Sequence, residues 1–326
     1  MAKILVTGGA GYIGSHTVYL LLKNGFDVTV VDDLSRGHMH NVPLKRLREL
    51  RLQDTEALVD LCDTVKFDAV IHFAAYIAVG ESTEQPELYF SNNVGGSLSL
   101  FTAMRETGVR RLVFSSSAAV YGTPKEVPVS EDAPIAPVSP YGESKAMVER
   151  MLRWLDEYSG LRSVSLRYFN ACGAEPGSGL GEEHEPETHL LPLVLRAVLT
   201  GEPVTVFGDD YATPDGTCIR DYIHVSDLAR AHILAVEKLL EGAPSDTLNV
   251  GTGRGYSVME VLRAVEKVTG KKVPYKIGPR RAGDPPELVA DPGRLKRTLG
   301  WEPEYTDLER IVATAWEFEQ AKKENK

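Results

Sequence analysis

A tyrosine and a lysine four residues apart offer the clearest chemistry in the sequence. The segment Tyr141-Gly-Glu-Ser-Lys145 follows Pro140, so we expect a helix that places both side chains on one face. A tyrosine with a pKa of about 10 is a poor base at neutral pH, but a nearby ammonium favours its phenolate. The pair therefore predicts a general base tuned by a cation. An ordinary exposed helix face is the alternative.

Three consecutive serines favour the chemical interpretation of this pair. Ser115-Ser116-Ser117 follow a short apolar run and are expected at the carboxyl end of a buried strand. Ligands bind at that edge of an open α/β sheet, where Ser117 would hydrogen-bond the same substrate oxygen as Tyr141. A polar strand end or a helix cap is the simpler alternative.

A glycine-rich segment near the N-terminus predicts where a dinucleotide binds. Gly8, Gly11 and Gly14 follow a predicted strand and open a predicted helix. Glycines permit a tight turn and close approach to a pyrophosphate, and the amide groups at a helix N-terminus, here near Tyr12 and Ile13, bind phosphate. A turn that packs a helix on a strand without any ligand is the alternative.

An aspartate at the end of the second predicted strand indicates which dinucleotide is held. The carboxylate of Asp32 would accept hydrogen bonds from ribose hydroxyls and repel a 2′-phosphate, which favours NAD over NADP. Asp33 competes for this role, and Arg36 keeps NADP open. With Ser117, Tyr141 and Lys145, the loop points to hydride chemistry on an alcohol carbon.

Alternating strands and helices predict the fold class, an α/β doubly wound parallel (Rossmann) sheet with a smaller mixed α/β substrate-binding lobe. The predicted strands are Lys3–Thr7, Val28–Val31, Ala69–Phe73, Arg111–Ser115 and Ser163–Phe169. The predicted helices are Ile13–Asn24, Thr55–Val65, Pro86–Thr107 and Pro140–Tyr158, three of them closed by glycine.

The regular alternation of predicted strands and helices changes after Asn170. We expect residues 1–169 to form the NAD-binding domain and residues 170–326 to form mainly the substrate lobe. Segments near 221–250 are expected to return to the main sheet, because Asp221–Val225 and Thr247–Val250 also resemble strands. Further helices are predicted at Ser226–Leu240 and Ser257–Thr269.

Composition narrows the class of protein. The 326 residues are 43% hydrophobic and 25% charged, with a net charge of −10, which argues against nucleic acid and anionic membranes as partners. Cys62, Cys172 and Cys218 form neither a disulfide framework nor zinc spacing, so we expect no metal. The sequence has neither a long apolar run nor a leader pattern, and we expect a cytoplasmic protein.

Longer motifs resemble a known family over nearly the whole chain. These are TGGAGYIGSH, VIHFAA, AVGES, NNVGGSL, FSSSAAVYG, SPYGESK, LRYFNACGA and, most specifically, GDDYATPDGTCIRDYIHVSDLA. They resemble the extended short-chain dehydrogenase/reductase family and, within it, the UDP-glucose (UDP-galactose) 4-epimerases. The resemblance implies a tightly held NAD, a UDP-sugar substrate, and a homodimer formed through helices near 86–107 and 140–158.

The resemblance also implies roles for individual residues. Tyr141 would be the base, Lys145 would tune it and contact the nicotinamide ribose, and Ser117 would bind the sugar 4-hydroxyl. The cofactor site would also include Phe73, Asn92, Ser115 and Tyr168. The nucleotide-sugar pocket would include Asn170, His189, Leu190, Phe207, Arg220, Arg281, Asp284 and Leu288.

The implied reaction interconverts UDP-galactose and UDP-glucose. The sugar is oxidised to a 4-keto form, rotates, and is reduced on the opposite face. The sequence departs from the family pattern at Arg51 and Ile77, near expected cofactor contacts, and at Leu288, where some members have a bulky tyrosine. We therefore expect a roomier sugar pocket that accepts N-acetylated UDP-hexoses.

Other functions share parts of this sequence pattern. Related 4,6-dehydratases need an acidic residue after the strand-end serine, and Ala118-Ala119 follow Ser117 here, which argues against dehydration. Another UDP-sugar epimerase or a decarboxylase shares the same core and stays open. A non-catalytic NAD-sensing regulator would have no need for Ser117, Tyr141 and Lys145 together.

Overall fold

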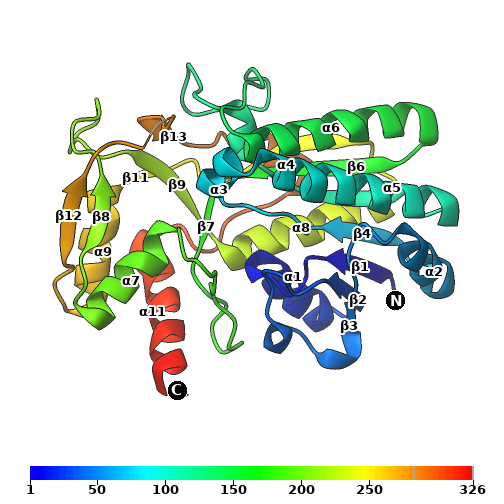
Figure 1. Ribbon diagram of the computed structural model, residues 1–326, viewed down its shortest axis with the longest axis horizontal. Coiled ribbons are helices and arrows are strands. Elements are labelled where there is room, and N and C mark those ends of the chain that lie inside the picture. Colours follow the sequence, from blue (N-terminus) through cyan, green and yellow to red (C-terminus); the bar gives the residue numbers. More distant parts are fainter. Residues whose placement is uncertain (282, 325–326) are drawn as a thin grey trace.

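A seven-stranded parallel sheet forms the centre of the protein (Figure 1). The computed structural model describes residues 1–281 and 283–324. The sheet strands are β1 (Lys3–Thr7), β2 (Asp27–Asp32), β3 (Leu47–Glu49), β4 (Ala69–His72), β5 (Arg111–Ser117), β6 (Arg162–Tyr168) and β10 (Asp246–Val250). Their order is β3-β2-β1-β4-β5-β6-β10, and every neighbouring pair is parallel. The predicted doubly wound class is confirmed.

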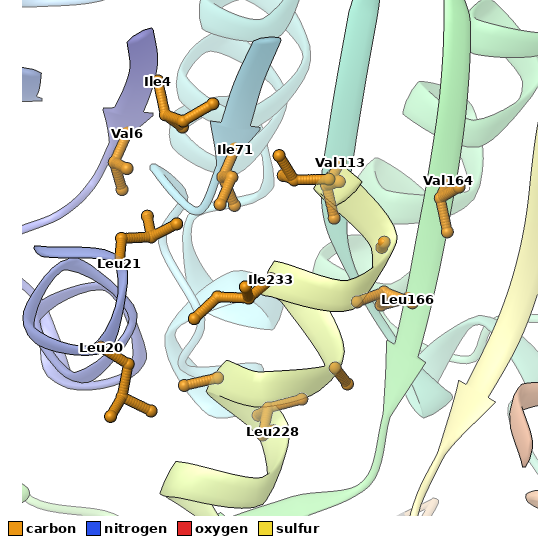
Figure 2. Packing of buried hydrophobic residues seen from close by; sticks show 14 of the residues in the cluster. Ile4, Val6, Leu20, Leu21, Ile71, Val113, Val164, Leu166, Leu228 and Ile233 are labelled. Atoms are coloured by element: carbon orange, nitrogen blue, oxygen red, sulfur yellow. The ribbon is translucent and has the colours of Figure 1, made fainter. Parts of the chain in front are cut away.

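Helices cover both faces of this sheet, because successive strand residues point to opposite sides. Ile4 and Val6 join the apolar layer beneath α1, α8 and α10, and Leu5 joins the layer beneath α2, α5 and α6. Figure 2 shows Leu20 and Leu21 of α1 and Ile233 of α8 packed against the first layer. The helices are α1 (Tyr12–Lys23), α8 (Val225–Leu240), α10 (Gly293–Leu299), α2 (Thr55–Val65), α5 (Gly96–Thr107) and α6 (Pro140–Ser159).

The predicted helix Pro86–Thr107 is interrupted. It consists of α4 (Pro86–Tyr89), a π-helical segment η3 (Phe90–Gly95) and α5. Within η3 the buried Asn93 side chain binds both the backbone N–H and the carbonyl of Tyr76, and it donates to Ser144 Oγ at 3.0 Å. These tertiary hydrogen bonds explain the local change of helix type, which no periodicity in the sequence reveals.

A smaller lobe follows β6. Its sheet places β9 (Ile219–His224) between β11 (Gly255–Ser257) and β13 (Glu287–Leu288), and β7 (Asn170–Cys172) also pairs with β9. Strands β8 (Val204–Phe207) and β12 (Tyr275–Gly278) form a second pair. Helices α7 (Leu190–Thr200), α9 (Val258–Thr269) and α11 (Leu308–Glu324) complete the lobe. The remaining short helices are α3 (Val79–Glu84), η1 (Met39–Asn41), η2 (Leu44–Arg46) and η4 (Ala118–Tyr121).

The two segments expected to return to the main sheet behave differently. Thr247–Val250 forms most of β10 and pairs with β6 as expected. Asp221–Val225 was placed wrongly, because β9 lies in the sheet of the smaller lobe. Asp221 explains this position, since its buried carboxylate accepts hydrogen bonds from the backbone of Thr252, Gly253 and Ala290. The domain boundary near residue 169 stays a prediction.

A buried ion pair fixes α6 against the sheet. The guanidinium of Arg167 on β6 donates to both oxygens of Glu149 on α6, with an Nη2–Oε2 distance of 2.6 Å. Ser116 Oγ at the end of β5 donates to the same carboxylate, and Tyr121 accepts a hydrogen bond from Arg167. Two strands and the helix are therefore joined at one charged cluster.

The ends of α6 follow ordinary capping rules. Ser139 Oγ accepts from the N–H of Gly142, Pro140 occupies the first turn, and Gly160 ends the helix with a φ of 64°.

Across the described ranges 1–281 and 283–324, no helix is both long enough and apolar enough to span a membrane.

Candidate functional site

The glycine loop meets two different demands. A Cβ on Gly14 would lie 2.2 Å from the carbonyl oxygen of Gly8, so glycine is required there for α1 to pack on the loop. Gly8 has a φ of 71°, and a Cβ there would lie 2.5 Å from Ala74 N. A Cβ on Gly11 would meet only Gly8 O at 3.5 Å among the described residues. Packing does not require glycine at position 11, so the space beside Gly11 is available for a ligand.

Asp32 lies directly beside this loop. Its Oδ2 accepts from Ala10 N at 2.9 Å and its Oδ1 accepts from Leu34 N at 2.9 Å. Asp33 instead accepts from the backbone and hydroxyl of Ser35 at the surface. The structure therefore brings Asp32, not Asp33, to the loop. Burial raises the pKa of Asp32, and the two backbone hydrogen bonds oppose that rise.

Tyr12 and Ile13 begin α1 at the loop. Gly11 is the N-cap, and it makes no side-chain capping bond within the part of the chain that the structure describes. Among the described residues no side chain therefore caps the first-turn amide groups, which suits the binding of an anion. The Tyr12 hydroxyl points elsewhere and donates to Gly173 O at 2.6 Å.

The proton-transfer residues meet at the carboxyl end of β5. The Ser117 hydroxyl lies beside the Tyr141 hydroxyl and acts to lower its pKa. Lys145 Nζ donates to the carbonyl oxygen of Ser115 at 2.8 Å and lies 6.0 Å from the Tyr141 ring centroid. Tyr168 completes the group, because Ser115 Oγ donates to its hydroxyl at 3.1 Å.

Burial dominates the protonation of the Tyr141–Lys145 pair. It raises the pKa of Tyr141, with Tyr168 adding to the rise and Ser117 opposing it. It lowers the pKa of Lys145 to about 7, although Glu149 acts in the opposite direction. The direction for Tyr141 differs from the one expected from spacing, because Lys145 bonds to a carbonyl and not to the phenol. A further positive charge beside Tyr141 is needed to favour its phenolate.

Two further predicted cofactor residues are Phe73 and Asn92. The strand order reverses between β1 and β4, and Phe73 directly follows β4. Phe73 follows β4, its N–H donates to Thr7 O at 2.9 Å, and its ring packs 4.6 Å from the ring of His232. Asn92 lies in η3 and accepts from Gln53 Nε2 at 3.3 Å. Gln53, two residues after Arg51, therefore contacts a predicted cofactor residue.

Cationic and aromatic side chains gather in the smaller lobe. Arg220 on β9 forms an ion pair with Asp284, in which Arg220 is buried and Asp284 is half-buried. The guanidinium of Arg281 lies 4.1 Å from the centroid of the Phe207 ring. Arginine binds phosphate through two parallel hydrogen bonds, so this group has the chemistry of a diphosphate site.

Leu288 links that group to the end of β5. On β13 it pairs in register with Arg220, and its side chain packs against the buried cluster that contains Ala118 and Phe169. Asn170 begins β7 next to β9, and Leu190 begins α7. The residues predicted to bind the substrate therefore come from five separate segments of the smaller lobe.

His189 has a different environment from the one expected. It is the N-cap of α7, but its Nδ1 faces Glu182 Oε1 at 2.8 Å and Glu187 Oε1 at 3.4 Å. Sequence reasoning missed these two glutamates, and it missed His184 beside them. It also missed Asn93, which lies next to a predicted residue in a recognised motif.

The parallel sheet, the glycine loop at its switch point and the buried Tyr141–Lys145 pair define a Rossmann-type nucleotide-binding protein. The model of the family described as "NAD dependent epimerase/dehydratase family" matches residues 4–251. The chain belongs to this family.

Relatives cover almost the entire chain. A protein named UDP-glucose 4-epimerase from Lactobacillus helveticus is 47% identical over 98% of this chain and 97% of its own length. The crystal structure of UDP-glucose 4-epimerase from Brucella ovis in complex with NAD is 47% identical, with a TM-score of 0.94 over 97% of this chain and 98% of that one. The UDP-Glc/GlcNAc 4-epimerase from Campylobacter jejuni is 41% identical, with a TM-score of 0.86 over 98% and 100%.

Replacing Gly14 and Gly11 by alanine separates packing from ligand approach. We expect Gly14→Ala to reduce the free energy of unfolding by about 1–3 kcal/mol, the range for overpacking, because the new methyl group collides with backbone. Gly11→Ala, the matched control, should leave stability within about 0.5 kcal/mol of wild type. Urea unfolding followed by circular dichroism compares them. Equal losses for both variants would contradict the assignment of Gly14 to packing.

Proposed function

We propose that the protein is an NAD-dependent epimerase that interconverts UDP-galactose and UDP-glucose. The observation that carries the proposal is the grouping of Tyr141, Ser117 and Lys145 at the carboxyl end of β5. The near-complete coverage by proteins named UDP-glucose 4-epimerase supports it. The reaction is an isomerisation, because the hydride returns to the sugar that supplied it.

The loop fits a dinucleotide. Gly11 leaves space for a pyrophosphate, the first turn of α1 offers its amide groups, and Asp32 would accept hydrogen bonds from the adenosine ribose. The buried carboxylate of Asp32 favours NAD over NADP, because a 2′-phosphate would be repelled. NAD, when bound, accepts a hydride from the sugar C4 and gives it back.

Tyr141 would remove the proton from the 4-hydroxyl as the 4-keto sugar forms. Ser117 would hold that oxygen through its hydroxyl, which already contacts Tyr141. Lys145 would contact the nicotinamide ribose and, as an ammonium, oppose the burial that disfavours the phenolate. After the sugar turns over, Tyr141 would return the same proton to the opposite face.

Binding energy would be concentrated on the UDP portion. Arg220 and Arg281 would bind the diphosphate, with Asp284 orienting Arg220 through their ion pair. The sugar would be held more loosely, so that both faces can reach the same acceptor. Asn170, Leu190, Phe207 and Leu288 would complete the pocket, and Phe73, Asn92, Ser115 and Tyr168 would complete the cofactor site.

The decisive assay uses UDP-galactose and purified protein without added NAD, with UDP-glucose measured chromatographically. We expect turnover, because the cofactor is retained. Tyr141→Phe should lower kcat by about 10²–10⁴-fold, the contribution of a general base. Tyr158→Phe is the matched control, because Tyr158 is on the same helix and 75% exposed. No product even with added NAD would contradict the proposal and favour a regulator or another UDP-sugar enzyme.

We also propose that N-acetylated UDP-hexoses are substrates. Leu288 is smaller than the tyrosine that the family resemblance leads one to expect here, and it packs beside the end of β5. The Campylobacter jejuni relative is named for both glucose and N-acetylglucosamine substrates.

Substitution of Leu288 tests this specificity. The wild type should turn over UDP-N-acetylgalactosamine, and Leu288→Tyr should lower kcat/KM for that substrate at least about 10-fold while UDP-galactose is still converted, because a misfit in a pocket costs about 1–3 kcal/mol. Leu288→Met, of similar volume, is the control. Turnover of UDP-galactose with none of the N-acetylated sugar by the wild type would refute a roomier pocket.

We further propose a homodimer that acts in the cytoplasm. Leu98 on α5 and Trp154 on α6 are 55% and 51% exposed, which supports an interface on these helices. The free, buried thiols of Cys62, Cys172 and Cys218 suit a reducing compartment. Light scattering that gives the 35.7 kDa mass of one chain would contradict the dimer.

A further inference from the structure

Four side chains of the types that ligate metals lie close together in the segment before α7. They are Glu182, His184, Glu187 and His189, whose ligand atoms all lie within 4.8 Å of one another. The Nδ1 of His184 is 3.2 Å from Glu182 Oε1 and 3.7 Å from Glu187 Oε2. The Nδ1 of His189 is 2.8 Å and 3.4 Å from the same two carboxylates.

These atoms face one another at ion-pair distance, but none of the contacts has the angle of a well-directed hydrogen bond. Glu182 Oε1 and the Nδ1 atoms of His184 and His189 are buried, and none has a hydrogen-bond partner within residues 1–281 and 283–324. A buried polar atom without a partner costs about 1–3 kcal/mol, so three in one place require compensation. An ion at their centre would satisfy all three at once.

The distances match a tetrahedral centre. Zinc binds imidazole nitrogen and carboxylate oxygen at about 2.0–2.2 Å, so the atoms around it are separated by about 3.3–3.6 Å. The four separations between imidazole and carboxylate, from 2.8 to 3.7 Å, bracket that value.

Glu187 is oriented in advance for such a role. Its Oε1 accepts from the backbone N–H groups of Thr188 and His189 at 2.7 and 2.8 Å. Its Oε2 faces His184, and the side chains of Glu187 and Glu182 are only 2% and 6% exposed. Hydrogen bonds of this kind position the ligands of metal sites in proteins.

We propose that Glu182, His184, Glu187 and His189 bind one Zn²⁺ ion. Four protein ligands leave no open position, so the ion has a structural role and takes no part in the reaction. This proposal revises the expectation of no metal, which rested on the cysteines alone. The sequence signal is Glu-x-His-x-x-Glu-x-His over residues 182–189.

The position of this site indicates what a bound ion would do for the structure. The ring of His184 packs edge-on against Tyr12, next to the glycine loop, with centroids 6.0 Å apart. His189 caps α7 of the smaller lobe. Between them, Glu183 accepts hydrogen bonds from His40 and Lys322. The ion would therefore fix the segment that lies between the cofactor loop and the substrate lobe.

Metal analysis of the full-length protein tests the proposal without measuring turnover. The protein is treated with a chelator, reloaded with Zn²⁺, freed of excess metal and analysed by mass spectrometry. We expect one Zn²⁺ per chain and, with Co²⁺ instead, the intense visible absorption of a tetrahedral ion. His184→Ala should lose both signals. His40→Ala is the control, because His40 contacts the same segment from outside the ligand set and should retain them.

Each contrary result is informative. A metal content well below one per wild-type chain, or a weak octahedral Co²⁺ spectrum, would overturn the proposal whatever the variants do. Full binding by His184→Ala would also overturn it. Circular dichroism identifies loss through misfolding, and Glu187→Gln, which retains the backbone contacts at Oε1, then replaces His184→Ala. None of these measurements depends on the reaction proposed above.

Discussion

The arrangement of the site depends on the buried ion pair between Arg167 and Glu149. Glu149 is one helical turn beyond Lys145 and two beyond Tyr141, so its position sets the depth and rotation of both along α6. Ser116 bonds to the same carboxylate from the end of β5. Removing one partner of a buried pair leaves an uncompensated charge at a cost of about 3–5 kcal/mol. The pair thus fixes the distance between the helix and the strand that carry the chemistry.

Around that constraint, the fold brings together residues from distant parts of the chain. The loop after β1 and the side chains after β4 lie at the switch point, while Ser117 and Tyr168 end two neighbouring strands. Arg220 reaches the site from a separate sheet. The residues proposed for proton transfer and those proposed for diphosphate binding therefore lie in different lobes.

Much of this architecture could be predicted because the information is local. Apolar runs identify buried strands, and glycines at 108 and 160 end helices in the left-handed conformation. Strand β3 escaped prediction because Leu47–Glu49 is short and mostly exposed. The break at Asn93 and the placement of β9 depend on hydrogen bonds between remote segments, which no sequence window contains.

The same distinction applies to the site. The motifs predicted Tyr141, Lys145 and Ser117, and the structure brings them together. Spacing alone could not reveal that burial raises the pKa of Tyr141, because that effect depends on the entire surrounding structure. His189 was recognised by its motif, but its neighbours Glu182 and Glu187 become visible only once the segment is folded.

Strand β10 ties the two lobes together. The chain leaves the main sheet after β6, builds much of the smaller lobe, and then returns as β10 to lie beside β6. Helix α8, which covers one face of the main sheet, also comes from this later part of the chain. A fragment ending at residue 169 would lack both, exposing the edge of β6 and the apolar face beneath α8. The later part of the chain therefore completes the main sheet and covers one of its faces, so the first 169 residues do not form the whole of that layer.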